Sequence, residues 1–547
     1  MTKLRAPLTI LLVILAATTA WSQSTASSGP ASPEETDIIV PELVLEVEEL
    51  EVQEVTAVLP EEGELAMGQV SIPLPGADEL GVDEGAFIVS APGMGPAPQD
   101  ASVFTSGRLG AGSVNYVAGE LSIYKLGTDP RYRLGFSHEG LDGYQFNDPG
   151  TGFFSQSNRI DGWLGADAEP LSTELEASFT EEVDGLQDQS DYFSAGLRRT
   201  AATADLTFTP DPLVELTATL DASIANRIQS ASGGAAIPRE QEFVLAPFAQ
   251  GSVAVGVVDI VLSTSYFLRF LAEGEIPIQQ DVEALAGLDV ALPASWSASG
   301  RAGISWDPGN PLAYPWSLSL QGVLGEALET TLSGGYRVER LTLSDIWTEV
   351  PIAAVGDADG DAELTNDGQW YGSLAARWSG PSGFTVTGSA EFVAHDAVVD
   401  LLAYDAVEDE FPFEQRSMRS VAASARASWR PNPGTQVQVG WTGTFLDQVT
   451  GAPTSAVDGS VRVSDPSERL SATAEARQEF YPDAALPWLS VSGSFAPSDE
   501  IAFILEFSDV IALLAEDGRP AIGAQVSPEF PFIEPGFRAS FLTRLSL

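Results

Sequence analysis

Cysteine is absent from the 547-residue chain, and the other residues that most often carry metal or catalytic chemistry are scarce. Without cysteine there is no disulfide framework, no zinc–thiolate or iron–sulfur site, and no lipid attachment at a signal-peptide cysteine. Histidine occurs only at His138 and His395, and lysine only at Lys3 and Lys125. Exported soluble proteins of this size often carry disulfides, so their absence favours a fold that gains its stability from backbone hydrogen bonds.

Positive charge is also in short supply. The chain carries 78 Asp and Glu residues against 26 Lys and Arg, which gives a formal net charge of −52 at pH 7. Such a field repels the phosphate backbone, so nucleic acid is excluded as a partner of the whole protein. The simplest interpretation of this acidity is solubility in a salty exterior. The alternative is a preference for cations, or bridging by divalent ions at the cell surface.

Long apolar runs are missing after the first residues of the chain. Lys3 and Arg5 precede an apolar run at residues 8–17, and small residues follow around Ala20 and Ser22. This order predicts a signal peptide at residues 1–22. The run is about half of the ~20 residues that a membrane-spanning helix needs. No later stretch reaches that length without charge or glycine, so a helical membrane architecture is excluded.

Familiar catalytic motifs are missing as well. The chain has no P-loop, no Gly-x-Gly-x-x-Gly, no nucleophile elbow and no His-Glu-x-x-His. His138 precedes Glu139, and His395 precedes Asp396. Neighbouring residues of a strand point to opposite faces, so neither pair forms a dyad within its own strand. We expect both histidines to be rim residues, and we expect no enzymatic activity and no cofactor.

Residues 23–100 differ in composition from the rest of the chain. Ser, Pro, Glu and Gly dominate both ends of this acidic segment, which is typical of disordered tails and linkers. Within it, residues 36–58 alternate apolar and acidic side chains until the phase slips at Leu50, and Pro41 interrupts regular pairing. An extended segment of this kind is suited to adding a strand to the sheet of a partner. The residues predicted to contact that partner are Ile38, Ile39, Val40, Leu43, Leu45 and Val47.

From residue 101 to the end, strand-like runs alternate with two kinds of connection. In each run, apolar side chains occupy one face and polar side chains the other. Short connections rich in Pro, Asp and Gly lie at 127–130, 210–212, 307–311, 380–383, 431–434, 465–467 and 497–499. Long acidic connections lie at 140–157, 181–191, 229–242, 272–291, 341–367 and 399–415. Short turns at one rim and long loops at the other are typical of barrels that present an apolar wall to lipid and a polar wall to a lumen.

The last twelve residues carry the most specific form of this pattern. Phe537, Phe541 and Leu545 share one face of residues 536–547, and Arg538 and Arg544 lie on the other. This segment resembles the terminal strand of Gram-negative outer-membrane β-barrel proteins. The resemblance implies an all-β fold: a transmembrane antiparallel β-barrel of roughly 16–20 strands at residues 101–547, in contact with outer-membrane lipid. Residues 23–100 would then be an extended N-terminal tail in the periplasm.

The barrel is similar to porins and to the barrel part of TonB-dependent transporters. Residues 35–40, Glu-Thr-Asp-Ile-Ile-Val, look like a TonB box, the motif by which those transporters engage a periplasmic energy-coupling protein. The resemblance implies a TonB-like partner for the tail. Residues 60–100 are too few for the globular plug that those transporters carry next. Insertion of the tail into the lumen, or contact with another periplasmic protein, are the alternatives.

Two pairs of tryptophans give an independent indication of a membrane. Trp296 and Trp306 share one strand face, and Trp370 and Trp378 share another. A tilted strand climbs about 2.5 Å per residue along the barrel axis, so these spacings cover roughly 20–25 Å. That height is close to the apolar band between two aromatic girdles. We therefore predict that both pairs face lipid.

Charged residues that lie opposite the apolar faces are the candidate site. They would either line an aqueous path with a transverse field or close into a packed polar core. These predicted lumen-lining residues are Arg301, Arg377, Arg426, Arg430, Arg538, Arg544, Glu174, Glu176, Asp221, Glu391 and Glu506.

One acidic loop has the alternate oxygen ligands of a calcium site. Asp357, Asp359 and Asp361 match the start of an EF-hand loop. Ala362 and Gly368 stand where that loop needs Gly and Glu. These departures favour a solvated acidic loop over a surface calcium site.

Taken with the two resemblances, these features predict an outer-membrane channel or transporter for small solutes. Its tail would couple it to a periplasmic partner. The alternative is a partner-binding or structural scaffold barrel with no open pore.

Overall fold

The computed structural model describes residues 103–127, 129–143, 147–231, 237–272, 278–293, 295–308, 310–325, 327–357, 364–402, 410–447, 453–480, 487–514, 519–520 and 533–546. The chain divides into two units, Met1–Gly93 and Met94–Leu547, and every described residue belongs to the second. The predictions made for the tail therefore lie outside the described residues.

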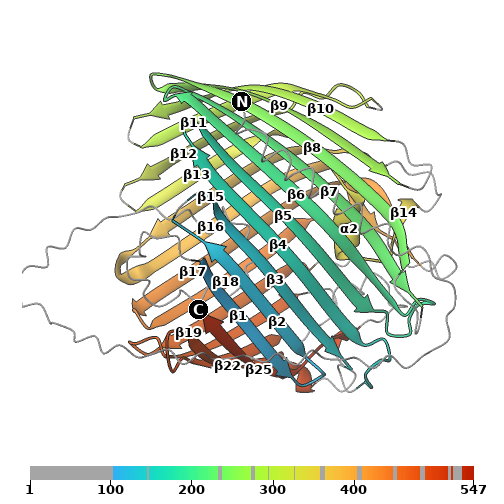
Figure 1. Ribbon diagram of the computed structural model, residues 1–547. Helices are drawn as coiled ribbons and strands as arrows, with labels where there is room; N and C mark the ends of the chain where they lie inside the picture. Colours follow the sequence, from blue (N-terminus) through green and yellow to red (C-terminus); the bar gives the residue numbers. More distant parts are fainter. Residues whose placement is uncertain are drawn as a thin grey trace, which may run out of the picture. The chain divides into compact units, whose positions relative to one another are not determined.

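The described residues form a closed antiparallel β-barrel of 22 strands (Figure 1). Each strand pairs with the next around the wall, and β25 returns to pair with β1, with Ser546 opposite Ser106. The strands are β1 (Val103–Gly112), β2 (Val117–Lys125), β3 (Arg131–Asp142), β4 (Phe154–Ala168), β5 (Leu171–Gly185), β6 (Ser194–Asp211), β7 (Val214–Ser230), β8 (Ile237–Val255), β9 (Val258–Leu271), β10 (Gln279–Leu292), β11 (Trp296–Trp306), β12 (Trp316–Leu324), β13 (Leu328–Glu339), β15 (Asp367–Ser379), β16 (Phe384–Leu401), β17 (Phe411–Asn432), β18 (Thr435–Leu446), β19 (Ser455–Ser464), β20 (Leu470–Phe480), β21 (Trp488–Phe495), β22 (Ile501–Ser508) and β25 (Arg538–Ser546). The predicted fold class is confirmed.

The number of strands exceeds the range expected from the sequence. That expectation assumed hairpins of nearly uniform length, whereas the wall is uneven: β21 and β22 have 8 residues each and β17 has 22. Short strands near the closing seam fit more hairpins into the same length of chain. Residues 316–336 supply most of strands β12 and β13.

Smaller elements lie outside the 22-stranded wall. They are α2 (Leu343–Glu349), η2 (Pro381–Gly383), η3 (Val510–Leu514), β14 (Ala353–Asp357), β23 (Arg519–Pro520) and β24 (Ile533–Glu534). β23 and β24 pair only with each other, and β14 pairs in parallel with β17. Among the described residues, no helix is long and apolar enough to cross a membrane.

The connections separate to opposite rims of the barrel. The turns after β2, β4, β6, β8, β10, β12, β15, β17, β19 and β21 are short and lie at one rim, which we call the short-turn rim. The opposite rim, the long-loop rim, carries most of the predicted acidic loops. Six of the seven predicted short connections lie at the short-turn rim, because their Pro, Gly and Asp residues suit tight turns.

Two predicted connections were wrong. Residues 307–311 follow β11 and lie at the long-loop rim, since turn chemistry does not reveal the rim to which a turn belongs. Most of the loop predicted at 272–291 is strand β10. Its acidic residues Asp281, Glu283 and Asp289 were interpreted as loop composition, but they occupy one face of a strand whose other face carries Val282 and Leu288.

A side chain organises the turn between β19 and β20. The Asp465 carboxylate accepts hydrogen bonds from the hydroxyl of Ser467 and from the backbone N–H of Leu470, the latter at 2.7 Å. These bonds, that of the Ser467 hydroxyl above all, hold the pKa of the Asp465 carboxyl below its ordinary value. The carboxylate takes up backbone donors that the strands leave unused at this turn.

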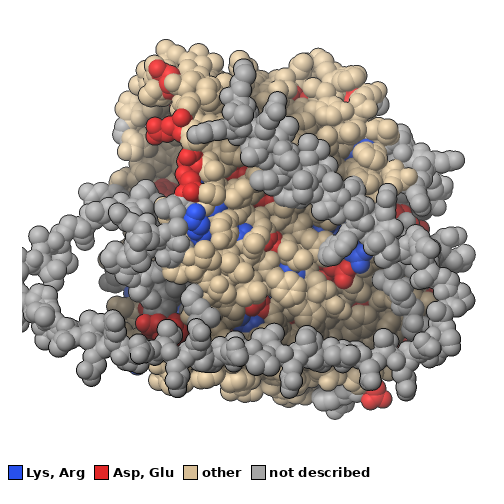
Figure 2. Space-filling model, viewed as in Figure 1, with Lys and Arg blue, Asp and Glu red and all other residues tan. Residues whose placement is uncertain are grey.

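The outer face of the wall is apolar along every strand. Leu109, Leu262 and Leu318 are 69%, 60% and 61% exposed, and comparable side chains repeat at every second position of their neighbours. Most of the wall visible between the grey segments in Figure 2 is tan, with few charged side chains. An exposed apolar area this extensive is typical of a surface that contacts hydrocarbon.

The four tryptophans lie on this outer face. Trp306 and Trp370 are each 52% exposed near the long-loop rim, and Trp378 is 39% exposed near the short-turn rim. Trp296 packs over Gly322 at the short-turn rim, where an added Cβ would come within 2.1 Å of the indole ring. Contact of these side chains with lipid stays a prediction.

Candidate functional site: the lumen and its crossbar

The inner face of the wall carries the charged residues singled out in the sequence. Each of the eleven alternates along its strand with exposed apolar residues, and therefore points away from the outer face. Two lie on each of β5, β17 and β25, and one lies on each of β7, β11, β15, β16 and β22. What they do there stays a prediction.

Several of these residues are held in ion pairs along the wall. Arg301 bonds Asp289 at 3.0 Å. Arg538 bonds Glu139 at 2.9 Å and lies 3.7 Å from Glu506, with its guanidinium 4.0 Å from the centre of the Tyr116 ring. Such pairs fix the side chains against the wall and neutralise part of its charge.

Carboxylates gather on β5, β6 and β7, in a cluster that we call the acidic patch: Glu174, Glu176, Asp205 and Asp221. Glu174 lies directly opposite Asp205 in the sheet register, and Thr203 lies between Glu176 and Asp221. The hydroxyl of Thr203 donates to Asp221 at 2.6 Å, and the indole N–H of Trp163 donates to Glu174. These hydroxyl and indole donors are uncharged, so the acidic patch keeps its negative charge.

Arginines gather on the strands across the lumen, in a cluster that we call the basic patch: Arg377, Arg426 and Arg430. In the sheet register Thr387 of β16 lies between Arg377 and Arg426. β17 is the eleventh strand on from β5, half-way round a circuit of 22 strands. Both patches lie in the half of the barrel nearer the short-turn rim, so charge of opposite sign faces across the lumen there.

A segment between β13 and β15 lies inside the barrel near the long-loop rim. It consists of Leu341–Asp357, with α2 and β14, and we call it the crossbar. In Figure 1, α2 is drawn inside the outline of the wall, beside β14, and it contacts both β6 and β7. Leu343, Ile346 and Trp347 are between 0% and 9% exposed and form the apolar side of this helix.

The crossbar joins opposite walls. Its apolar side packs with Leu197 of β6 and Ala225 of β7, and Phe413 of β17 belongs to the same buried cluster. A second cluster brings Ile352 of the crossbar against Phe411 of β17 and Ala195 of β6. β17 is the tenth strand on from β6, nearly half-way round. The crossbar therefore bridges the lumen and does not merely line one side of it.

Buried charged side chains on the wall hold the start of the crossbar and the chain that follows it. The Glu242 carboxylate accepts from the backbone N–H groups of Leu343 and Ser344, each at 2.8 Å. Arg269, 3% exposed, donates to the carbonyls of Leu341 and Leu364 at 3.1 Å each. Backbone groups that would otherwise be unsatisfied away from water thus find charged partners.

The middle of the crossbar is held by Arg227. This guanidinium is 4% exposed and donates to the carbonyl of Ala353 at 2.6 Å. It also bonds Glu240 at 2.6 Å and lies 3.6 Å from Glu410, at the start of the β17 side. The pairing of β7 with β8 shifts register between Asn226 and Ile228, and the extra residue of this bulge lies on β8, opposite Arg227.

The two histidines have different surroundings. His395 donates through Nδ1 to Asp367 of the neighbouring strand at 2.6 Å, a pair that no inspection within one strand would find. His138 lies on the outer face, where its Nδ1 is 2.7 Å from the amide oxygen of Asn158. The first is a structural contact between a partly buried histidine and a buried carboxylate.

The predicted metal and docking residues fall largely outside the described residues. Asp359, Asp361 and the six tail residues are among those not described, and Asp357 ends β14 with its backbone opposite Phe413. Among the described residues, no group of three or more His, Cys, Asp or Glu side chains could hold a metal ion.

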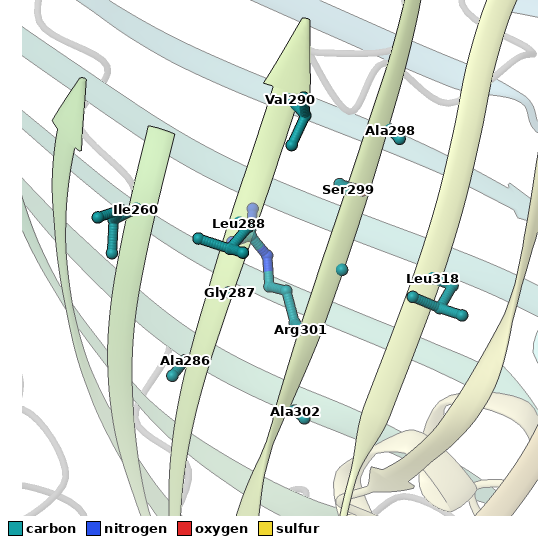
Figure 3. Close-up of a pocket in the computed structure, with 11 residues that line it drawn as sticks. Ile260, Ala286, Gly287, Leu288, Val290, Ala298, Ser299, Arg301, Ala302 and Leu318 are labelled. Atoms are coloured by element: carbon teal, nitrogen blue, oxygen red, sulfur yellow. The ribbon is translucent and has the colours of Figure 1, made fainter. Parts of the chain in front are cut away.

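A hollow of about 590 Å³ lies in the wall between β9 and β12 (Figure 3). Ile260, Leu288 and Leu318 border it, and small residues such as Gly300 form its floor. These residues have the outward parity of their strands, whereas Arg301 beside them turns to the lumen. The hollow therefore belongs to the apolar outer surface and adds nothing to the luminal site.

No protein-family model matches the sequence, and no curated protein matches it either. Solved structures do match. The siderophore receptor PirA from Acinetobacter baumannii superposes with a TM-score of 0.60 at 8% identity, over 82% of this chain and 81% of that chain. The FrpB iron transporter from Neisseria meningitidis (F5-1 variant) gives 0.62 at 10% identity, and the copper transporter OprC gives 0.60 at 10%, both with the same coverage. The fold of this chain is that of these receptor and transporter structures.

Within this receptor-type barrel, the predictions from sequence did not include the residues that organise the lumen near the long-loop rim. Arg227, Glu242 and Arg269 looked like ordinary polar positions, because their partners are backbone groups more than seventy residues away in the chain. One signal was available. Residues 341–355 are mostly apolar and include Ile346 and Trp347, which is unusual for a loop in water.

Proposed function

We propose that this protein is an outer-membrane channel or transporter for small hydrophilic solutes. The observation that carries the proposal is the separation of charge across the lumen, with the acidic patch on β5–β7 facing the basic patch on β15–β17. The two patches lie about half a circuit apart, so their charged groups do not pair with each other, and Glu329 lies opposite Arg377 in the sheet register. The apolar outer face supports location in a bilayer.

The two oppositely charged walls exert an electric field on a solute that passes between them. A low-dielectric wall focuses the field into the lumen, so a dipolar solute is oriented and its hydration is partly replaced by side chains. The carboxylates attract cations on one side while the guanidinium groups attract anions on the other. Passage is then favourable for solutes that carry both kinds of polar group, or for small ions.

We further propose that the tail couples the barrel to a periplasmic, TonB-like protein. The TonB-box-like residues 35–40 and the fold of the TonB-dependent receptors support this proposal. The similar structures are described as a siderophore receptor, an iron transporter and a copper transporter, so we include chelated metals among the solutes proposed for this barrel.

A second candidate is a scaffold barrel with no open pore. The crossbar favours it, because the crossbar bridges nearly opposite walls and is held by buried charges. In that case the protein would recruit a partner through its tail and pass nothing.

Conductance in planar lipid bilayers separates the two candidates. We expect purified full-length protein to pass ions. Replacing Glu174 and Asp205 with Gln and Asn should lower the preference for cations, and replacing Arg377 and Arg426 with Gln should raise it. A correctly folded protein that stays silent with and without residues 23–100 would favour the scaffold.

Deletion of residues 36–58 tests the tail. The barrel should fold and remain heat-resistant, while retention of a periplasmic partner from solution should be lost. If the deletion unfolds the barrel, the segment is structural and the docking proposal fails.

A further inference from the structure

The crossbar occupies the mouth of the lumen at the long-loop rim, and its attachment points to a specific role. We propose that the crossbar is a fixed constriction that sets the largest solute the barrel admits, and that Arg227 is the anchor that joins it to both walls. This inference rests on the proposed channel function. It assigns the selection by size to the crossbar and leaves the selection by charge to the two patches near the other rim.

Position is the first argument. The crossbar contacts β6 and β7 on one side and β17 on the other, so a solute entering from the long-loop rim must pass beside it. Among the side chains of α2 that the structure describes, those of Asp345 and Thr348 are exposed. Polar groups therefore lie on the side of α2 that faces away from its apolar contacts.

The attachment of Arg227 is the second argument. Its guanidinium contacts three parts of the molecule at once: the carbonyl of Ala353 in the crossbar, Glu240 on the β8 side of its own hairpin, and Glu410 at the foot of β17. Arg227 is 4% exposed. Separating its guanidinium from these partners is costly, because its positive charge would then lie away from water without compensation. One side chain thus ties the crossbar to both walls.

Redundancy of the anchors is the third argument. Glu242 holds the start of α2 and Arg269 holds the segments on both sides of the crossbar. Gln415 of β17 accepts from the backbone N–H of Thr365 at 2.8 Å, just before the chain rejoins the wall. A lid that opened during each passage would need to break these buried contacts together. The arrangement suits a constriction that stays in place.

The test compares Arg227→Met with Arg419→Met. Both changes remove one guanidinium and keep an aliphatic chain, but Arg419 is exposed and belongs to the outward face of β17. Entry of neutral polyethylene glycols of increasing size into protein-containing vesicles gives the size limit. We expect Arg227→Met to admit larger polymers and to raise single-channel conductance several-fold, with Arg419→Met like the wild type. A variant with residues 343–352 replaced by a short Gly/Ser linker should show the larger limit even if Arg227→Met does not fold.

Hydrogen–deuterium exchange supplies a readout that does not depend on transport. The amides of Leu343 and Ser344, which donate to Glu242, should exchange slowly in the wild type and in Arg419→Met and faster in Arg227→Met. Rapid exchange in the wild type would overturn a fixed constriction. An unchanged size limit in the linker variant would overturn its role in selection. If the linker variant and the wild type both fail to pass ions, the channel function itself is wrong.

Discussion

Replacing Asp367 with alanine is expected to destabilise the barrel strongly, and the structure gives an order for three related variants. Asp367 is the first residue of β15 and is 1% exposed. Its Oδ1 accepts from the backbone N–H groups of Asp396 and Ala397 at 3.0 and 2.8 Å. Its Oδ2 accepts from His395 Nδ1 at 2.6 Å and from the Gln369 amide at 2.8 Å. Together these bonds hold the register shift that β16 makes after His395.

The magnitude follows from counting the donors that lose their acceptor. Each buried donor left without a partner costs about 1–3 kcal/mol. Asp367→Ala leaves the two backbone N–H groups orphaned, so these alone cost about 2–6 kcal/mol. Asp367→Asn keeps an oxygen in the place of Oδ1 but turns an NH₂ group towards His395 and Gln369. Its cost should be smaller than that of alanine.

Urea unfolding of the barrel in lipid vesicles, followed by tryptophan fluorescence, measures these costs. The control is Asp396→Asn, which lies in the same bulge but has an exposed side chain. A surface change of this kind is worth within about 0.5 kcal/mol. Stability should fall in the order wild type and Asp396→Asn, then Asp367→Asn, then Asp367→Ala. The reasoning is refuted if Asp367→Ala unfolds at the same urea concentration as the control.

Three further outcomes are expected from the two faces and the two rims. Leu374→Arg should cost about 2–4 kcal/mol in the same urea experiment, because it puts a charge on the lipid side near mid-height, while Ser373→Arg on the inner face should cost little. A cysteine at Asp148 should react with an impermeant thiol reagent on intact cells and one at Glu468 should not; the reverse labelling would invert the topology. The lowered pKa of Asp465 means that its contribution to stability is present above the ordinary carboxyl pKa and lost as the pH falls through the lowered value. The difference in thermal stability between wild type and Asp465→Asn should therefore shrink in acid, and a difference independent of pH would contradict the turn described above.

Much of the wall could be predicted because its physical cause is local. Alternation of apolar and polar side chains along a strand needs only the period of two, so the inward direction of Glu174 or Arg426 could be inferred from their immediate neighbours. The pairs Trp296–Trp306 and Trp370–Trp378 likewise follow from strand parity and rise. Tight turns such as that at Asp465 can be predicted from the Pro, Gly and Asp residues in the sequence.

The interior near the long-loop rim could not be predicted, because its contacts join distant parts of the chain. Arg269 on β9 donates to the carbonyls of Leu341 and Leu364. Because every residue has a backbone carbonyl, the sequence does not show which carbonyls accept such bonds. The dyad of His395 and Asp367 depends on the register between β15 and β16, which no single strand reveals. The acidic composition of residues 341–367 suggested a solvated loop and concealed the buried Trp347.

The seam between β1 and β25 also constrains the order in which the barrel can assemble. Every other pairing in the wall joins strands that are neighbours along the chain, whereas this one brings Ser106 to Ser546. Neighbouring strands can zip together quickly as hairpins, but ends so far apart in sequence meet only after the entropic cost of closing the whole loop. Until they meet, β1 and β25 both present open edges that can pair with another chain. Ring closure is therefore the step at which folding competes with aggregation, and a mutation confined to Arg538–Ser546 would expose both edges while leaving the other twenty strands able to form.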